Sequence, residues 1–198
     1  MIKFIEPDES KPYKIFFKYY NDALVKNQEA IEAMCISSFN VDMNEVDSRY
    51  VNLKYIKDSE WIFFSNYNSP KSIAFNAHNQ VSALIYWKSI NLQIRIKANI
   101  KKTDSSFSDK HFNSRSREKN SLAISSNQSS STQSFDEVLD NYINVFESNK
   151  NLYRPDYWGG FSFTPYYFEF WEGHSSRLNK RDVYKKNGDN WQHLLIQP

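Results

Sequence analysis

Two arginines near the C-terminal end of the sequence are the residues best suited to hold an anionic ligand. Arg177 and Arg181 lie four residues apart, after Trp171 and Gly173, in the stretch FEFWEGHSSRLNKRDVY. A guanidinium can donate two parallel hydrogen bonds to a phosphate, or stack on a conjugated ring. In a turning chain both side chains can reach one anion, with Trp171 as an apolar wall. The alternative is a surface strand end with solvated cations, and composition alone favours it.

Other kinds of catalytic or metal site lack support in the sequence. The four glycines, at positions 159, 160, 173 and 188, are too few for a GxGxxG or P-loop site, so side chains must hold any phosphate. The histidines lack i, i+4 pairs and neighbouring carboxylates, which predicts no metal site. No GxSxG motif is present, and the single cysteine, Cys35, lies in the apolar run AMCIS, which favours burial over catalysis. The pair Gly159 and Gly160 after Trp158 is more typical of a strand entry than of a phosphate loop.

Charge and length narrow the class of protein. The formal charge of +2, from 25 basic and 23 acidic residues, gives no global attraction to nucleic acid or to a membrane surface, so neither is an expected partner. A chain of 198 residues is expected to form a single domain. No run approaches the roughly 20 apolar residues of a membrane span, and the N-terminal residues lack the apolar segment of a signal peptide. We therefore expect a soluble, cytoplasmic protein, and a single cysteine suits that reducing compartment.

Hydrophobic periodicity predicts the elements that must position these residues. Mixed three- and four-residue spacing predicts an N-terminal helix over about residues 12–32. Between about residues 33 and 102, five segments rich in β-branched and aromatic residues predict strands, and NSPKSIAFNAHNQ predicts a short helix. Strands at this spacing favour an antiparallel barrel or sandwich. The strand segments are AMCISSF, SRYVNLKYI, EWIFFSN, QVSALIYWKS and LQIRIKANIKK.

The second half of the chain changes composition. Residues from about 103 to 134 are rich in Ser, Asn, Lys and Arg, which by composition favours a disordered linker. A helix is predicted from there to about residue 150, with Ser134 as its N-cap and Glu137 completing a capping box. Two or three further strands are predicted from about 158 to 198, and KNGDN predicts the hairpin turn between the last two.

The C-terminal stretch WGGFSFTPYYFEFWEGHSSRLNKRDVY resembles a signature of the pyridoxamine 5'-phosphate oxidase family. That signature runs WGG, a strand, P, EFW, G, RL, a two-residue step, then R and an aromatic residue. The upstream segments SRYVNLK, FFSNYNSPK, LQIRI and HFNSRSREKNSLAISSNQSS are similar to further family motifs in the same order, so the resemblance extends from about residue 12 to 198. The matching signature residues are Trp158, Gly159, Gly160, Pro165, Glu169, Phe170, Trp171, Gly173, Arg177, Leu178, Arg181 and Tyr184.

This resemblance implies both a fold and a reaction. The fold is mainly β with flanking helices, an FMN-binding split β-barrel of the antiparallel Greek-key type that the chain forms as one domain. The family forms homodimers with FMN at the subunit interface. It oxidises pyridoxamine or pyridoxine 5'-phosphate to pyridoxal 5'-phosphate with O2 and releases H2O2. The serine-rich stretch around Gln128 would then be an ordered ligand loop rather than a linker.

The family's functional positions carry over to matching residues of this sequence. Arg177 is expected to position the reacting centre in catalysis. Arg49 and Lys71 are expected to supply charge for the flavin phosphate. The residues expected to bind FMN are Arg49, Val51, Lys54, Phe64, Ser65, Lys71, Gln93, Gln128, Ser129, Trp171 and Arg181. The residues expected to bind substrate are Lys54, His111, Arg115, Lys119, Arg177 and Asn179.

Five positions depart from the family pattern. His111 replaces a tyrosine, Lys119 a serine and Pro70 an arginine, while Asn179 and Lys180 replace a histidine and an aspartate. Histidine and lysine can still donate to a phosphate, whereas Asn179 cannot titrate near neutral pH. Two alternatives therefore stay open. One is an FMN-dependent oxidase acting on a different ring substrate, as the phenazine-pathway relatives do. The other is a flavin- or pyridoxal-phosphate-binding protein without turnover.

Overall fold

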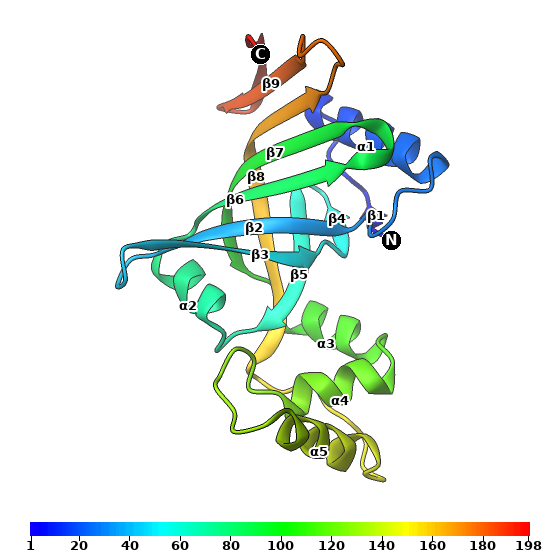
Figure 1. The fold of residues 1–198 in the computed structure, drawn as a ribbon, viewed down its shortest axis with the longest axis vertical. Coiled ribbons are helices and arrows are strands. Elements are labelled where there is room, and N and C mark those ends of the chain that lie inside the picture. Colours follow the sequence, from blue (N-terminus) through cyan, green and yellow to red (C-terminus); the bar gives the residue numbers. More distant parts are fainter.

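The computed structural model describes residues 1–198, and its main feature is a ten-stranded sheet with five α-helices around it (Figure 1). A 3-10 turn over Lys88–Ile90 joins two of the strands. The strands are β1 (Lys3–Ile5), β2 (Ala33–Asn40), β3 (Glu45–Asn52), β4 (Tyr55–Lys57), β5 (Glu60–Asn66), β6 (Gln80–Trp87), β7 (Leu92–Lys102), β8 (Trp158–Glu172), β9 (Lys180–Asn187) and β10 (Asn190–Leu195). The helices are α1 (Lys11–Val25), α2 (Pro70–Ala77), α3 (Ser105–Asn113), α4 (Arg117–Ser125) and α5 (Phe135–Phe146).

The strands form an open, curled sheet rather than a closed barrel. Their order is β1-β4-β5-β8-β7-β6-β2-β3, and β9 pairs with both β8 and β10. All pairs are antiparallel except β1 with β4. The curl brings β3 near β5 without hydrogen-bonded pairing between them (Figure 1). This arrangement confirms the predicted mainly β, split-barrel fold.

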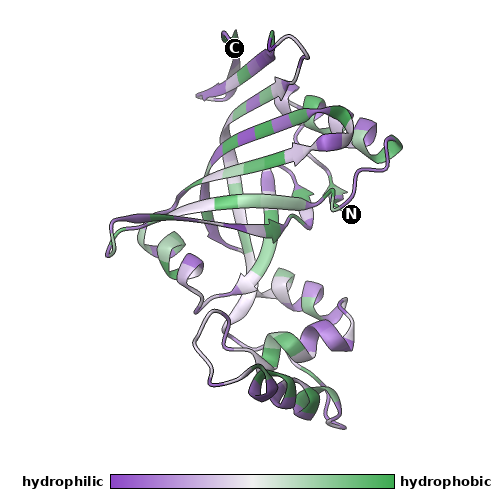
Figure 2. Ribbon diagram, in the orientation of Figure 1, coloured by the Kyte–Doolittle hydropathy of each residue, from purple (hydrophilic) through white to green (hydrophobic).

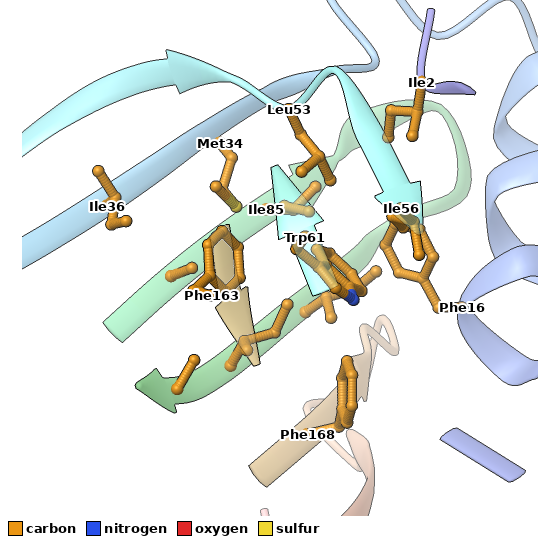
Figure 3. Packing of buried hydrophobic residues seen from close by; sticks show 14 of the residues in the cluster. Ile2, Phe16, Met34, Ile36, Leu53, Ile56, Trp61, Ile85, Phe163 and Phe168 are labelled. Atoms are coloured by element: carbon orange, nitrogen blue, oxygen red, sulfur yellow. The ribbon is translucent and has the colours of Figure 1, made fainter. Parts of the chain in front are cut away.

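Alternating burial explains why these segments form strands. Along β6 every second residue is buried, and Figure 2 shows hydrophobic and hydrophilic bands alternating along the strands. Strand residues point to opposite faces in turn, so one face of the sheet builds the core. Trp61, Phe163 and Phe168 pack there with Phe16 from α1 (Figure 3). Burying each such side chain contributes about 1.5–3 kcal/mol.

The N-terminal helix is shorter than its sequence pattern predicts. α1 begins at Lys11 with Pro12 in its first turn, where a missing N–H costs nothing, and it ends at Val25 instead of near residue 32. Asn27 and Ala30 adopt left-handed φ values of 52° and 46°, which a helix cannot continue through. The predicted end of this helix was therefore wrong.

The serine-rich segment is folded, not a linker. α3 and α4 occupy most of residues 103–126, and they bury Phe112, Asn120 and Ser121. At the start of α5 the Ser134 hydroxyl accepts a hydrogen bond from the Glu137 N–H at 3.2 Å, which confirms the predicted N-cap. The reciprocal hydrogen bond of a capping box, from the Ser134 N–H to the Glu137 side chain, does not form. The Glu137 carboxylate accepts from Thr132 and Gln133 instead.

Three further predictions concern single features. Gly188, with φ of 56°, turns the chain between β9 and β10, which confirms the predicted hairpin. Cys35 is only half-buried on the face of β2 that points away from the core, so the prediction of burial was wrong. None of the helices has the length and apolar character that a membrane span requires.

Candidate functional site

A cleft of about 660 Å³ opens beside the split between β3 and β5. This volume is in the range of sites for cofactors and small substrates. β3, β5, α2, α3, α4 and the start of β8 all contribute to its walls. The lining residues are Arg49, Tyr50, Val51, Asn52, Lys54, Phe64, Ser65, Asn66, Pro70, Lys71, His111, Arg115, Lys119, Leu122, Ala123, Ser126, Gln128, Ser129 and Trp158.

The cleft has five cationic side chains in its walls and no aspartate or glutamate. The cations fall into two groups. Arg49 and Lys71 are close enough for the charge of one to act on the other. Lys54, Arg115 and Lys119 surround the ring of His111 and act on it in the same way. A cleft of this charge favours anionic ligands, and two groups of cations can serve two separate anions.

Lys71 is a buried lysine without a carboxylate partner. It is 7% exposed, and its Nζ donates to the Ser69 hydroxyl at 3.2 Å. Burial, with the charge of Arg49 adding to it, lowers the pKa of Lys71 to about 8. Arg49 donates to the Ser38 hydroxyl at 2.8 Å, and Asp47 is 3.6 Å from its guanidinium. Both ammonium and guanidinium therefore retain N–H groups that an anion can accept from.

Arg115 packs over an aromatic wall of the cleft. Its guanidinium carbon is 4.4 Å from the centre of the Trp158 ring, and Nη2 donates to the Lys119 carbonyl at 2.9 Å. Nη1 is buried without a hydrogen-bond partner in the chain. Burial lowers the pKa of Arg115 to about 10, so the group stays charged at neutral pH. An unsatisfied, charged donor in a cleft is suited to an anionic ligand.

His111 is held between aromatic residues as a neutral ring. Its ring centre is 3.6 Å from that of Phe64, with 14° between the planes, and Nδ1 is 2.9 Å from the Tyr55 hydroxyl. Burial first, and then the charges of Arg115 and Lys54, lower the pKa of His111 to about 4. When Tyr55 donates to Nδ1, the N–H lies on Nε2 and His111 can donate one hydrogen bond to a ligand.

The loop after α4 is tied to the sheet. The Gln128 Oε1 accepts hydrogen bonds from the Ser65 hydroxyl at 3.3 Å and from the Asn66 N–H at 3.2 Å. Ser129 follows in the left-handed region, with φ of 71°. These contacts bring Gln128 and Ser129 against β5 inside the cleft.

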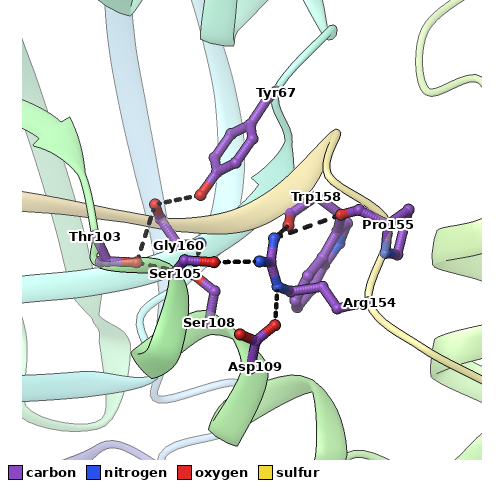
Figure 4. Close-up of polar contacts among 9 residues, drawn as sticks. All are labelled: Tyr67, Thr103, Ser105, Ser108, Asp109, Arg154, Pro155, Trp158 and Gly160. Atoms are coloured by element: carbon purple, nitrogen blue, oxygen red, sulfur yellow. Dashed lines mark hydrogen bonds and ion pairs between the residues drawn. The ribbon is translucent and has the colours of Figure 1, made fainter.

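A buried arginine fixes the end of the cleft at which β8 begins. Arg154 donates to the Asp109 carboxylate at 2.6 Å, the Ser105 hydroxyl at 2.6 Å and the Trp158 carbonyl at 2.7 Å (Figure 4). Its side chain is 9% exposed. The contacts join α3, which carries His111, to the strand that carries Trp158.

The glycine pair after Trp158 allows other side chains to approach the backbone. A Cβ on Gly159 would overlap the Tyr67 hydroxyl, and one on Gly160 would lie 2.5 Å from the Thr103 Oγ1. The Tyr67 hydroxyl donates to the Gly160 carbonyl at 3.2 Å, as Figure 4 shows. Both glycines belong to β8, so they serve a strand entry with close packing.

Five of the predicted site residues lie outside the cleft. Gln93 on β7, Trp171 on β8 and Arg181 on β9 are direct cross-strand neighbours in one row. Trp171 lies thirteen residues after Trp158 on β8, which at about 3.3 Å per residue is on the order of 40 Å along the strand. In Figure 1, β8 runs from the helices α3–α5 at one end of the molecule to β9 at the other. One chain therefore does not bring these residues together with the cleft.

Arg177 and Asn179 lie in the turn between β8 and β9. Arg177 has a left-handed φ of 65°, and its N–H donates to the His174 carbonyl at 3.0 Å. The Asn179 Oδ1 accepts a hydrogen bond from the His174 N–H at 3.0 Å. The neighbouring Lys180 pairs with Glu172 at 3.3 Å and Asp182 at 2.7 Å. Asn179 thus organises the turn that presents Arg177.

Some lining residues were not predicted from the sequence to be part of the site, although Pro70 was noted as a departure from the family pattern. Trp158 was noted as part of a motif, but its ring was not predicted to support Arg115. Polar residues next to predicted positions and the apolar face of α4 were the available signals. The residues concerned are Tyr50, Asn52, Asn66, Pro70, Leu122, Ala123, Ser126 and Trp158.

Comparison with known proteins places this geometry in a family. Residues 158–198 match the family profile described as the pyridoxine 5'-phosphate oxidase C-terminal dimerisation region. Among solved structures, PhzG from Burkholderia lata in complex with tetrahydrophenazine-1-carboxylic acid has a TM-score of 0.91 at 24% identity, covering 96% of this chain and 93% of that one. A pyridoxamine 5'-phosphate oxidase-related, FMN-binding protein from Nostoc punctiforme has a TM-score of 0.77 at 11% identity, covering 96% and 99%. Both show the same split-barrel fold.

Proteins related in sequence show the family to which the chain belongs. A pyridoxine/pyridoxamine 5'-phosphate oxidase of Legionella pneumophila is 31% identical over 196 residues, covering 98% of this chain and 90% of the relative. Pyridoxine/pyridoxamine 5'-phosphate oxidase 1 of Hydrogenovibrio crunogenus is 32% identical over 195 residues, covering 96% of this chain and 89% of the relative. With this similarity along nearly its whole length, the chain belongs to the pyridoxine/pyridoxamine 5'-phosphate oxidase family of oxidoreductases.

Proposed function

We propose that the protein is an FMN-dependent oxidase that converts pyridoxamine or pyridoxine 5'-phosphate to pyridoxal 5'-phosphate with O2, releasing H2O2. The whole chain would act as one FMN-binding domain in the cytoplasm. The observation that carries this proposal is the pair of cation groups in a cleft whose lining contains no carboxylate. The reaction needs two phosphates in one site, one on the cofactor and one on the substrate, and each group can take one of them.

The residues of the cleft fit the phosphate end of FMN. Lys71 and Arg49 supply the charge, and their free N–H groups match phosphate oxygens. Ser129 adds a hydroxyl donor, and Ser65, whose hydroxyl donates to the Gln128 Oε1, holds the Gln128 amide beside it. FMN would contribute the hydride transfer and its own reoxidation by O2, and the protein would contribute binding and orientation.

The substrate would occupy the second group of cations. Arg115 and Lys54 would hold its phosphate, with Lys119 at the rim of the cleft and His111 as a neutral donor. The buried Nη1 of Arg115 gains a partner when a phosphate binds there. The stacked rings of Phe64 and His111 leave an aromatic surface beside this anion site, which suits a ring-containing substrate.

The site would be completed by a second copy of the chain. Trp171, Gln93 and Arg181 lie on one row of the outer sheet face, and Arg177 lies in the adjacent turn. They are too far along β8 to reach the cleft of their own chain. In a homodimer with FMN at the interface, this row of one copy would cover the cleft of the other, and Arg177 would be the residue that positions the reacting carbon. The match of residues 158–198 to a dimerisation region supports this arrangement.

The proposal is tested by oxygen-dependent turnover. Purified protein loaded with FMN is mixed with pyridoxamine or pyridoxine 5'-phosphate, and pyridoxal 5'-phosphate and H2O2 are measured against a flavin-free control. Product formation above that control is expected. Bound FMN without any turnover on either substrate would contradict the reaction while leaving the cofactor site intact.

A related oxidase with a different ring substrate is the second candidate. It is favoured by Asn179, which stands where the family has a histidine. The Asn179 side chain accepts a hydrogen bond from the His174 N–H and so belongs to the turn. A panel of phosphorylated and unphosphorylated amines and ring carboxylates separates the two candidates. An Asn179→His variant run alongside adds a second criterion, since a large gain on pyridoxamine 5'-phosphate would show that the native chain is adapted to another substrate.

A further inference from the structure

A buried carboxylate outside the cleft holds two arginines on the outer face of the sheet. Glu169 on β8 has a side chain that is 1% exposed. Its Oε1 accepts two hydrogen bonds from Arg181, from Nε at 2.9 Å and from Nη2 at 2.7 Å. Its Oε2 accepts one from the Arg95 Nη1 at 2.9 Å and one from the Tyr167 hydroxyl at 2.8 Å. Four donors from three adjacent strands therefore meet at one carboxylate.

This group lies directly beside the row of residues that would face the cofactor. Arg95 is the cross-strand neighbour of Glu169. Gln93 and Trp171 form the neighbouring pair, two residues before Arg95 on β7 and two residues after Glu169 on β8. Residues two apart on a strand share a face. The side chain of Arg95 is 45% exposed, so its guanidinium is accessible on this face. Arg95 is not one of the predicted site residues.

The charges on this face do not cancel. One carboxylate balances one of the two guanidiniums, which leaves a net charge of about +1 within the group of Glu169, Arg95 and Arg181. The Arg181 guanidinium cannot rotate freely, because Nε and Nη2 are bound to Glu169 and Nη1 donates to the Gln197 carbonyl at 2.9 Å. Its remaining N–H groups are thereby fixed in direction.

We propose that Glu169 is a positioning residue that fixes Arg181 and recruits Arg95 as a second guanidinium, so that one copy presents a defined positive charge to the flavin of the other. This inference rests on the proposed FMN function. Positive charge near a flavin favours its reduced form, and negative charge disfavours it, so the protein sets the reduction potential through such groups. Arg95 becomes a residue of the cofactor environment.

The test compares two variants, one that removes a negative charge and one that removes a positive charge. In Glu169→Gln one negative charge is removed, and the flavin midpoint potential is expected to become more positive. The loss of a fixed Arg181 is also expected to raise the dissociation constant of FMN about tenfold, equivalent to about 1.4 kcal/mol. In Arg95→Gln one positive charge is removed, and the midpoint potential is expected to become more negative. Potentials are measured by redox titration of bound FMN, and affinities by quenching of free FMN fluorescence.

The matched control is Glu172→Gln. Glu172 lies on the same strand and pairs with Lys180 at 3.3 Å. Its side chain is 40% exposed, and it forms no hydrogen bond with Arg95 or Arg181. Its replacement is expected to leave both the potential and the affinity within error. A merely structural role of Glu169 would not produce shifts of opposite sign in the Glu169 and Arg95 variants.

The outcomes separate this inference from the function on which it rests. Wild-type protein that cannot bind FMN overturns both. Wild-type protein that binds FMN, with variant potentials that are unchanged or shifted in the same direction, overturns the role of Glu169 alone. If Glu169→Gln does not fold, Arg95→Gln and Tyr167→Phe decide. Tyr167→Phe removes one hydrogen bond to Oε2 and is expected to weaken FMN binding by a few-fold, and no effect in either variant overturns the proposal.

Discussion

Trp158 and Trp171 stand at opposite ends of a single strand, β8. The ring of Trp158 lines the cleft and supports Arg115, whereas Trp171 lies outside the cleft, between Gln93 and Arg181 on the neighbouring strands. A chain with both halves of a site on one extended strand cannot close them on each other. We expect the halves to meet in the proposed homodimer, where two copies facing each other with twofold symmetry would form two sites per dimer.

Complementation between variants tests this arrangement. Lys71→Met damages the cleft, and Arg177→Ala damages the opposite end, so each homodimer is expected to have little activity. When the two variants are unfolded together and refolded in equal amounts, half of the dimers are mixed, and one of their two sites is intact. About a quarter of wild-type turnover is therefore expected from twofold geometry. No recovery in the mixture would mean that each site is built within one chain.

The pKa of Lys71 predicts how FMN affinity depends on pH. In the free protein this pKa is about 8. A bound phosphate raises it, so above pH 8 the complex holds a proton that the free protein has lost, and affinity must fall as pH rises. The phosphate of FMN is already doubly ionised there, since its second pKa is about 6. The dissociation constant is expected to rise by up to about tenfold per pH unit between pH 8 and 10.

Variants at position 71 test whether Lys71 causes the pH dependence of FMN affinity. Lys71→Met is expected to weaken FMN binding about 10- to 100-fold at pH 7, because a charged hydrogen bond to phosphate contributes about 1.5–3 kcal/mol. Its affinity is also expected to be flat between pH 8 and 10. Lys101→Met is the control, since Lys101 is 69% exposed and pairs with Glu60 outside the cleft. A variant at position 71 that keeps the wild-type pH profile would assign the dependence to another group.

His111 makes stability depend on pH in the acid range. Its pKa is about 4 in the folded chain against an ordinary 6.5, so between these values the unfolded chain binds more protons and the free energy of unfolding falls as pH falls. The loss from this group is on the order of 3 kcal/mol between pH 6.5 and 4. His111→Tyr, which restores the family residue, is expected to remove most of it in urea titrations at several pH values. His174→Gln, in the exposed turn, is the control and is expected to keep the wild-type slope.

Much of the fold was predictable because it depends on local patterns. The segment over residues 80–87 is rich in β-branched and aromatic side chains, which favours a strand, and the structure buries every second residue along it. The end of α1 was not predictable from periodicity, since the left-handed turn at Asn27 interrupts a pattern that would otherwise continue. Composition alone misread the serine-rich segment as a linker, whereas the family resemblance predicted an ordered ligand loop. Its composition is polar, but Phe112 is buried against the distant Trp158, and Asn120 is buried while donating to the Phe112 carbonyl.

The candidate site was also predictable from the sequence only in part. The resemblance supplied eleven residues that the structure gathers in one cleft, but their electrostatic state depends on burial that no sequence pattern reveals, as for Lys71. The sequence also gave no sign that Glu169 would collect donors from three strands. Nor did it indicate Arg154, because its partners Asp109 and Ser105 lie more than forty residues earlier in the chain.

Arg154 offers a last prediction, because it supports the cleft without lining it. Arg154→Ala removes a 9% exposed side chain that donates to Asp109, Ser105 and the Trp158 carbonyl. The carbonyl is left without its donor, and a loss of about 2–3 kcal/mol in the free energy of unfolding is expected. Arg154→Lys keeps the charge but not the planar fork, so it should recover only part of that loss.

The same variants should affect anion binding through Trp158. If Arg154 holds this strand end in place, the ring that supports Arg115 becomes less ordered in Arg154→Lys, and binding of pyridoxal 5'-phosphate or inorganic phosphate should weaken several-fold even under conditions where the variant is fully folded. Lys18→Ala, which breaks an exposed pair with Asp22, is the control and should change stability by no more than about 0.5 kcal/mol. Unfolding in urea and phosphate binding by calorimetry measure the two effects separately. A folded Arg154→Lys protein with wild-type phosphate affinity would confine the arginine to a role in stability.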